Sequence, residues 1–308
     1  TGRATGEDEN DGKTITTTEG QTNYVEIYNS ASIQVVSISG NPVVVSTGQE
    51  ITVIMVVTNS GEGIADGVEP GTMYILNNGS GGANIISGPD PTSASINAHG
   101  YQEFTWVYSA ASAGTIWFSN NASGYDDTRG NTIYAEGAWS NTINIQTEAS
   151  LIAGIEGIPE KVSIGQMITV YVTVTNTGEA GAEGVRPITP SAGSNVVALT
   201  GPDPNEAVIG GGGIQVFTYT YSANGAGVIS LTTLVEGYDV NSKVTKTASG
   251  TSNSITIEEP AQLTSYINAE PSIVKEKEDI ITVYMTVTNV GEAEAINVVP
   301  SLTGTGGP

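Results

Sequence analysis

The chain has 308 residues, of which 38% are hydrophobic and 13% charged, and its 32 acidic and 9 basic residues give a net charge of −23. Phosphate groups repel such a chain, so nucleic acids and anionic membrane surfaces are excluded first as partners. The absence of cysteine excludes disulfide frameworks and thiolate metal sites. No apolar run approaches the roughly 20 residues that a membrane-spanning helix needs. Cations, sugars and other proteins remain as partners.

The first segment repeats a sequence found further along the chain. Gly6–Ile27 aligns with Gly124–Ile145, with Asp8 matching Asp126 and Gly12 matching Gly130. Residues 1–30 are therefore predicted to be the C-terminal part of a preceding repeat. We expect the chain to be a window on a longer array. The rival interpretation is a filament subunit whose ends complete a neighbour's domain by strand addition.

A second repeated phrase defines the units that follow. It reads ITVIMVVTNSGE from Ile51, ITVYVTVTNTGE from Ile168 and ITVYMTVTNVGE from Ile281. The period of about 115 residues is the length of one small domain. The sequence thus predicts a repeat over 31–149, a second over 150–262 and the N-terminal part of a further repeat over 263–308.

Alternation with period two predicts a strand in each phrase. In the second copy, Ile168, Val170, Val172 and Val174 share one face, and threonine and tyrosine occupy the other. The corresponding apolar face in the first copy starts at Ile51, and that of the third comprises Ile281, Val283, Met285 and Val287. We expect this face to be the core in every copy, with the threonine-rich face exposed.

Each of these strands ends at Thr-Asn-x-Gly-Glu, where asparagine and glycine would supply left-handed backbone angles for a tight turn. Further strands are predicted around Val185, Phe217–Tyr221, Gly227–Gly237 and Ser254–Glu259. About seven short strands per copy, with no helical periodicity, indicate an all-β fold of tandem Ig-like antiparallel β-sandwich domains.

The order ITVxVTVTNTGE…GPDP…FTYTYSA…SNSITI resembles tandem Ig-like surface-protein repeats of bacteria and archaea, namely the adhesion-related (CARDB) domain and the TVTNTG-type repeats. The most specific part is VTVTNTGE at Val172–Glu179, and the likeness covers nearly the whole chain. Such repeats occur in long secreted or surface-attached proteins, as stalks, spacers, adhesins or filament components. The resemblance implies an extracellular or cell-surface location.

Candidate catalytic residues are few. His99 is the sole histidine, and the matching position of the second copy is Gly212. The nucleophile-elbow, P-loop and zinc-protease motifs do not occur. Carboxylates are plentiful enough for a glycosidase pair, but active sites are rarely duplicated along a tandem array. The sequence therefore predicts a surface histidine and no enzyme.

Calcium is the candidate metal, because clustered oxygen ligands on a loop suit this ion. The candidate ligands are Asp126 and Asp127 of the first copy, Asp239 of the second, and Asp8 and Asp11 near the N-terminus. The alternative is that these acids are solvated turn residues, since the EF-hand spacing is not met.

Aromatic rows allow two interpretations. The rows Phe104/Trp106/Tyr108 and Phe217/Tyr219/Tyr221 are predicted to fill the core rather than to stack on sugars. Trp117 and Trp139 align with Ser230 and Thr251 of the second copy, so they do not belong to a sugar-binding surface repeated in both copies.

Two asparagines, Asn78 and Asn121, lie in N-x-Ser sequons and are candidate glycan acceptors in a surface protein.

Repetition itself favours a structural role: a segment of an extracellular fibre, stalk or surface layer. The alternative is an adhesin for a glycan or a partner surface, with calcium stiffening compatible with either. Expected partners are other copies of the chain, surface proteins or glycans. The junctions Gln146–Ile152 and Glu258–Leu263 lack long Gly/Ser runs, which predicts semi-rigid connections.

Overall fold

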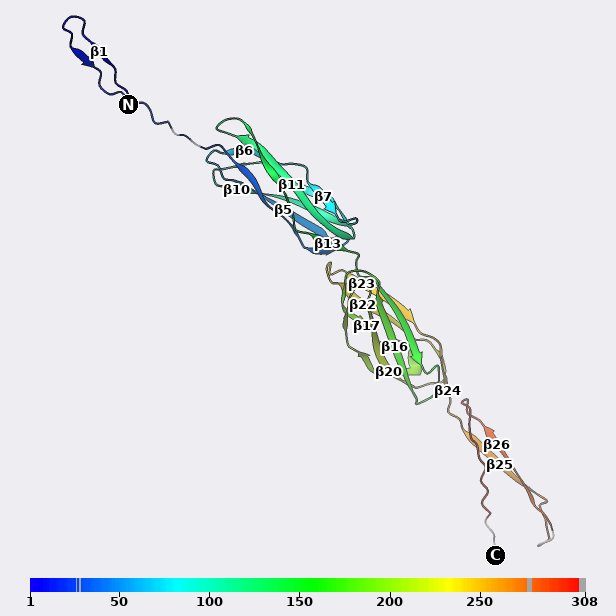
Figure 1. Ribbon diagram of the computed structural model, residues 1–308. Helices are drawn as coiled ribbons and strands as arrows, with labels where there is room; N and C mark the ends of the chain where they lie inside the picture. The colour runs from blue at the N-terminus through cyan, green and yellow to red at the C-terminus, as the bar shows by residue number, and fades with distance from the viewer. Residues whose placement is uncertain (26, 28, 276–278, 305–308) are drawn as a thin grey trace.

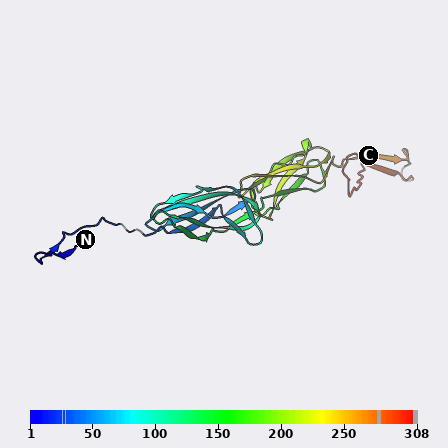
Figure 2. The ribbon, with the colours of Figure 1, turned by 90° about the horizontal axis from the view of Figure 1, so that it is seen from above.

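The computed structural model describes residues 1–25, 27, 29–275 and 279–304. Two elongated β-sandwiches follow one another end to end along the chain (Figure 1; Figure 2). One two-stranded hairpin precedes the first sandwich, and another follows the second. The helical content of this part is one short 3-10 turn, η1 (Gly193–Asn195). Among the described residues, none forms a helix with the length and apolarity that crossing a membrane requires.

The first sandwich is built from two sheets. One has the order β3-β5-β10-β8, and the other has the order β4-β13-β11-β6-β9, with β7 and β12 also paired to β11. The bounds are β3 (Ile33–Asn41), β4 (Val44–Ser46), β5 (Glu50–Asn59), β6 (Ala65–Pro70), β7 (Tyr74–Asn77), β8 (Gly82–Asp90), β9 (Ala94–Ile96), β10 (Tyr101–Ser112), β11 (Gly114–Asp126), β12 (Thr132–Trp139) and β13 (Ile143–Gln146).

The second sandwich repeats this plan. Its sheets have the orders β14-β16-β20-β18, β15-β24-β21 and β19-β17-β22-β23. The bounds are β14 (Leu151–Ile158), β15 (Lys161–Ser163), β16 (Met167–Asn176), β17 (Ala182–Pro187), β18 (Val196–Asp203), β19 (Ala207–Ile209), β20 (Ile214–Ala223), β21 (Gly227–Ile229), β22 (Thr232–Asp239), β23 (Thr245–Thr251) and β24 (Ile255–Glu258). Each sheet takes its strands from one side of Ser150.

The all-β, Ig-like sandwich fold is thus confirmed, with two differences in detail. Each domain has more strands than predicted, because short three-residue segments such as β4, β9, β15 and β19 form strands of their own. One strand pair in each domain is parallel: β4 with β13, and β15 with β24. Because β13 and β24 are the last strands of their domains, this pairing places the ends of β4 and β15 where the chain leaves each domain.

The repeated phrase forms β5 and β16, and its apolar face is the core as predicted. Ile168, Val170, Val172 and Val174 are fully buried, and the alternate residues are half-buried. The aromatic rows also lie in the core, with Phe104 and Phe217 completely buried. Each domain holds its own apolar cluster. Burial of a Val, Leu, Ile or Phe side chain contributes about 1.5–3 kcal/mol, so these rows are a main source of each domain's stability.

The two hairpins are β1 (Thr5–Glu7) with β2 (Thr14–Thr16), and β25 (Leu263–Glu270) with β26 (Thr282–Asn289). The prediction that the repeated phrase is core in every copy is wrong for the third copy in this structure. Val283 and Val287 remain 42% and 36% exposed. The reason is structural: β16 lies between β14 and β20, whereas β26 pairs with β25 alone among the described strands.

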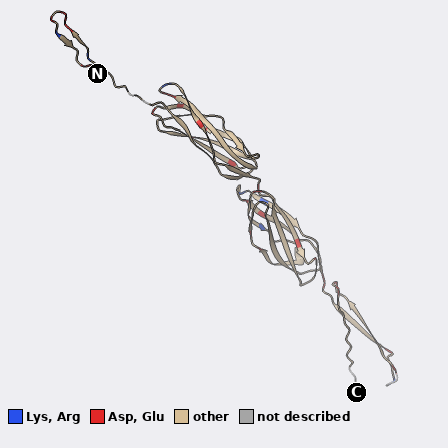
Figure 3. Ribbon diagram, in the orientation of Figure 1, with Lys and Arg blue, Asp and Glu red and all other residues tan. Residues whose placement is uncertain are grey.

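Charge is unevenly distributed between the domains. Acidic residues occur along both, whereas Arg129 is the single Lys or Arg between residues 31 and 149 (Figure 3). The second domain carries Lys161, Arg186, Lys243 and Lys246, each within 4.0 Å of a carboxylate oxygen. The charged residues of the first domain are therefore acidic, with the single exception of Arg129.

Candidate functional site

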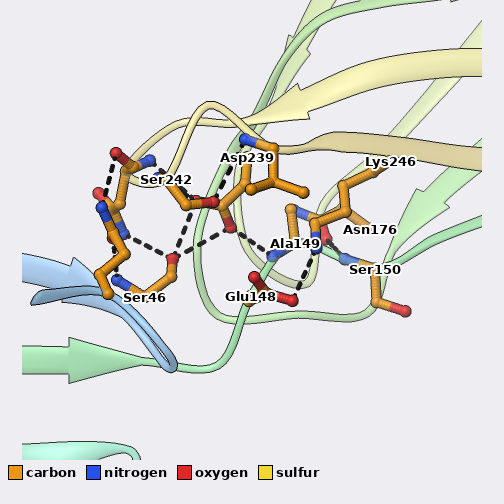
Figure 4. A network of polar contacts seen from close by, with 11 residues as sticks. Ser46, Glu148, Ala149, Ser150, Asn176, Asp239, Ser242 and Lys246 are labelled. Carbon is orange, nitrogen blue, oxygen red and sulfur yellow. Dashed lines mark hydrogen bonds and ion pairs between the residues drawn. The ribbon is translucent and has the colours of Figure 1, made fainter. Parts of the chain in front are cut away.

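The two domains contact each other through a hydrogen-bond network at their junction, and the centre of this network is buried (Figure 4). Ser46, at the end of β4, donates its hydroxyl to the carboxylate of Asp239, at the end of β22; Ser46 Oγ lies 2.9 Å from Oδ1 and 3.1 Å from Oδ2. Both residues are fully buried. A buried carboxylate is costly unless it is hydrogen-bonded, so the position of each domain end depends on the other.

Backbone N–H groups donate further hydrogen bonds to the Asp239 carboxylate. The N–H groups of Asn241 and Ser242 donate to Oδ1 at 2.9 and 2.8 Å, and that of Ala149, in the linker, donates to Oδ2 at 2.7 Å. One carboxylate thus holds its own loop, the linker and the preceding domain. Hydrogen bonds to a charged group contribute about 1.5–3 kcal/mol each.

Amide side chains extend this network. Asn241 Nδ2 donates to Ser46 Oγ at 3.2 Å and to Gln146 Oε1 at 2.9 Å. Gln49 Nε2 donates to the carbonyl of Asn241 at 3.1 Å, and Gln49 Oε1 accepts the N–H of Ser46 at 2.6 Å. The first domain therefore offers one hydroxyl, that of Ser46, and two amide side chains, those of Gln49 and Gln146, to a single loop of the second.

The surroundings of Asp239 also set its protonation. Burial acts to raise the pKa of this carboxyl, but the hydrogen bonds from Ser242, Ala149 and Ser46 outweigh it and leave the pKa below its usual 3.8. Asp239 is therefore ionised at neutral pH, when the network needs an acceptor.

The glutamate of each Thr-Asn-x-Gly-Glu phrase holds the linker that enters its own domain. Glu62 accepts the N–H of Asn29 at 2.8 Å, and Glu179 accepts that of Thr147 at 2.8 Å. In the third copy, Glu292 accepts the N–H of Glu259 at 2.9 Å. The same contact at three repeats identifies the phrase as a linker clamp.

The asparagine of the phrase holds the linker from a second side. Asn176 Oδ1 accepts the N–H of Ser150 at 3.0 Å, and its Nδ2 donates to the carbonyl of Ala180 at 2.8 Å. Asn59 and Asn289 make the corresponding bonds in the first and third copies.

The glycine of the phrase is required for a reason other than the one predicted. Gly61, Gly178 and Gly291 do not adopt left-handed backbone angles. Instead, a Cβ on Gly178 would stand 2.0 Å from the carbonyl oxygen of Glu148, and one on Gly61 would stand 2.1 Å from that of Ser30. The linker backbone thus occupies the space that any side chain would need.

An ion pair fixes the linker on its other flank. Lys246 Nζ lies 2.7 Å from Glu148 Oε2, and the lysine side chain is largely buried. Figure 4 shows this pair beside Ala149 and Ser150. The linker between the domains is therefore held by Asp239, Glu179, Asn176 and Lys246.

The five candidate calcium ligands lie in three loops of matching geometry. Asp8, Asp126 and Asp239 each accept, through Oδ1, the N–H of the residue two positions further on, at 2.9, 3.0 and 2.9 Å. Asp127 and Asp11 are exposed, and Asp11 pairs with Lys13 at 2.9 Å, which lowers the pKa of Asp11.

In each of these loops one carboxylate, half-buried at Asp8 and buried at Asp126 and Asp239, accepts a backbone N–H in this way. In the part of the chain that the structure describes, no group of three or more His, Cys, Asp or Glu side chains gathers in a way that could hold a metal ion. At Asp239 a calcium ion would have to displace the hydrogen bonds from Ser46 and Ala149. Calcium binding stays a prediction.

The remaining sequence candidates lie apart from the junction network. His99 is exposed in the loop before β10, with φ of 57°, as a surface histidine should be. Asn78 is exposed in the turn after β7, and Asn121 is exposed on β11. Glycan attachment to these two asparagines stays a prediction, as does the absence of enzymatic activity.

Sequence reasoning missed Ser46 and Gln49 as junction residues. Their signal was present: Ser46-Thr-Gly-Gln49 returns as Ser163-Ile-Gly-Gln166 just before the second repeated phrase. The local geometry returns too, because the N–H of Ser163 donates to Gln166 Oε1 at 2.7 Å. Alternation of apolar residues shows the core but carries no signal for a domain end.

Comparisons with known proteins add little. No family model and no curated protein matches the chain. Among solved structures, it is similar to red sea bream transglutaminase, with 16% identity over 77% of this chain and 32% of that one and a TM-score of 0.27. It is also similar to the native conformation of E. coli alpha-2-macroglobulin, with 11% identity over 78% of this chain and 18% of that one and a TM-score of 0.31. The chain thus spans a third or less of these proteins, and likenesses so weak carry no statement about its function.

Proposed function

We propose that this chain is a segment of an extracellular fibre, stalk or surface layer, in which tandem Ig-like domains act as stiff spacers. The observation that carries the proposal is the repeated linker clamp, formed by Glu62, Glu179 and Glu292 in three successive copies. A freely hinged array has no use for a clamp at every junction.

The junction between the two sandwiches supports the same role. A flexible Gly/Ser linker would allow the domains to reorient, whereas here the linker backbone is tied at Thr147, Ala149 and Ser150. Buried Ser46 and Asp239 add a direct bond between domains. With rigid junctions, each additional repeat lengthens the array by about the length of one domain.

The extracellular location and the relation to surface-protein repeats are part of this proposal. They rest on the TVTNTGE phrase and on the contact of its glutamate with the chain that enters the domain. The proposed partners are other copies of the chain or other surface proteins.

Two experiments test the proposal. Small-angle X-ray scattering of the full chain should give the profile of a rod with two globular segments in line; a compact or freely hinged profile would contradict the stalk role. Antibody labelling of intact producing cells should stain their surface. Staining that requires permeabilised cells would contradict the location.

A binding role, as an adhesin, is the second candidate. Evidence for this role is a surface that differs between the two domains, because features common to both are explained by the shared fold. The first domain carries such a surface on its β7-β11-β12 sheet.

A further inference from the structure

An aromatic face distinguishes the first domain from the second. In the first domain, Ser119 on β11 lies opposite Tyr74 on β7 and opposite Trp139 on β12. Residues directly opposite one another in a sheet project from the same face. Tyr74 and Trp139 are each 64% exposed, so two rings flank one small hydroxyl residue on the outer surface.

A second row runs beside the first. Ser123, four residues along β11, lies opposite Tyr134 on β12 and opposite Glu69 on β6. Tyr134 is 76% exposed, and Glu69 is exposed as well. Because side chains at alternate positions of a strand share a face, Ser119, Asn121 and Ser123 form a polar line between the rings.

The same positions of the second domain carry no aromatic residue. There Thr232 lies opposite Ser191 and Thr251 in the place of the first row. Glu236 lies opposite Arg186 and Thr247 in the place of the second. The fold therefore does not need rings at these positions, because the same sheet forms with polar and charged side chains.

We propose that this surface, the aromatic face of Tyr74, Trp139, Tyr134, Ser119, Ser123 and Glu69, binds a neutral polysaccharide chain. Exposed Trp and Tyr rings present flat apolar surfaces with a polar tip, which suits the apolar face of a pyranose ring. Tyr74 and Trp139 are two strand spacings apart, about 10 Å, so the rings can stack on successive parts of one extended chain.

Charge selects the kind of polysaccharide. The carboxylate of Glu69 and the exposed Glu136 of β12 can accept hydrogen bonds from sugar hydroxyls. The same carboxylates repel uronate or sulfate groups, and Arg129 is the one basic residue of this domain that could counter them. A hydroxyl-rich, uncharged ligand fits, and an anionic one does not.

This inference gives a site and a ligand class to the adhesin role, on which it rests, and it is independent of the stalk role. The test is affinity electrophoresis of the full chain through gels containing neutral polysaccharides (mixed-linkage β-glucan, xyloglucan, galactomannan), with alginate as the anionic comparison. Pull-down on insoluble cellulose and chitin covers crystalline ligands. Wild-type protein should be retarded or captured by at least one neutral polysaccharide and not by alginate.

The variants take their residues from the second domain, which shows that the sheet accepts them. Trp139→Thr and Tyr74→Ser should weaken binding about tenfold or more, the equivalent of roughly 1.4 kcal/mol. The matched control is Tyr101→Ile, which changes an equally exposed tyrosine on β10 of the opposite sheet to the residue found at Ile214; it should bind as the wild type does. Melting temperatures show whether each variant is folded.

The proposal is overturned if the wild-type protein binds no neutral polysaccharide, if it prefers alginate, or if Trp139→Thr and Tyr101→Ile bind alike. Binding to a protein surface that persists after its glycans are oxidised with periodate would also overturn it, in favour of a protein partner. In each of these cases a rod-shaped scattering profile would leave the stalk role standing.

Discussion

Ser46 and Asp239 lie in different domains, yet the hydroxyl of one is 2.9 Å from the carboxylate of the other, and both are shielded from water. The bond joins the chain-exit end of the first sandwich to a loop that opens at the entry end of the second. This hydrogen bond therefore holds the two domains in a fixed position relative to each other.

Removing this hydroxyl should destabilise the junction. Ser46→Ala deprives a buried carboxylate of one donor, which costs about 1–3 kcal/mol. Urea unfolding of the full chain should show this loss. Ser163→Ala is the matched control, because Ser163 occupies the same position of the second domain and is only half-buried. An equal effect of the two substitutions would contradict the role of Ser46.

Acid should loosen the junction through Asp239. Because the pKa of this carboxyl is lowered by folding, its stabilising contribution is complete above the unfolded pKa near 3.8 and is lost as pH falls through the lower, folded pKa. Thermal melting of the wild type should therefore drop more steeply below about pH 4 than that of Asp239→Asn, which cannot titrate there. Parallel curves for the two proteins would contradict this assignment.

Alkali should destabilise the second domain through its tyrosine pair. Burial raises the pKa of Tyr219 to about 12, and burial together with Tyr219 raises that of Tyr221 further. Both hydroxyls donate to backbone carbonyls, those of Pro187 and Pro190, at 3.0 and 2.5 Å.

A raised phenol pKa means that the folded state keeps a proton that the unfolded state releases. Stability contributed by Tyr219 is therefore complete below the unfolded pKa near 10 and declines between about pH 10 and 12, by up to about 1.4 kcal/mol per pH unit. Tyr219→Phe should be less stable at pH 7 but should fall less steeply above pH 10, when unfolding is followed by circular dichroism. An unchanged slope would contradict this account.

Calcium is tested directly by chelation. If Asp126, Asp127, Asp239, Asp8 or Asp11 hold the ion, EDTA should lower the melting temperature and added calcium should restore it. The hydrogen bonds that already fill Asp239 predict little effect at the junction itself. A melting temperature unchanged by chelator would remove calcium from the account.

Much of the fold could be predicted from the sequence, because a strand with one buried face has apolar residues at every second position. The alternation from Ile168 to Val174 gave both the strand and its buried face, and the FTYTYSA row gave the neighbouring strand. The third copy was mispredicted because alternation shows which face is apolar but not what covers it.

The junction could be predicted only in outline. Short linkers indicated stiffness, but the atoms responsible come from residues 193 positions apart, Ser46 and Asp239, and their pairing depends on how two folded domains meet. The sequence makes Asp239 a candidate calcium ligand or a turn residue, because a carboxylate in a turn has the same sequence whether it binds a cation or accepts hydrogen bonds from N–H groups.

The aromatic face was likewise hidden from sequence comparison between the copies. The second copy has Thr251 in place of Trp139, which excludes Trp139 from a site repeated in both copies but not from a site that the first domain alone carries. Strand register showed that Trp139 and Tyr74 flank the same serine, which no linear spacing reveals.

The most direct test of the stiff-junction account is the distance distribution between spin labels on the two domains. The chain has no cysteine, so Glu103→Cys on β10 and Thr251→Cys on β23, both exposed, place labels cleanly. Pulsed electron paramagnetic resonance should give one narrow distance, which broadens when Ser46→Ala and Asp239→Ala are combined. A broad distribution in the otherwise unaltered chain would contradict the account.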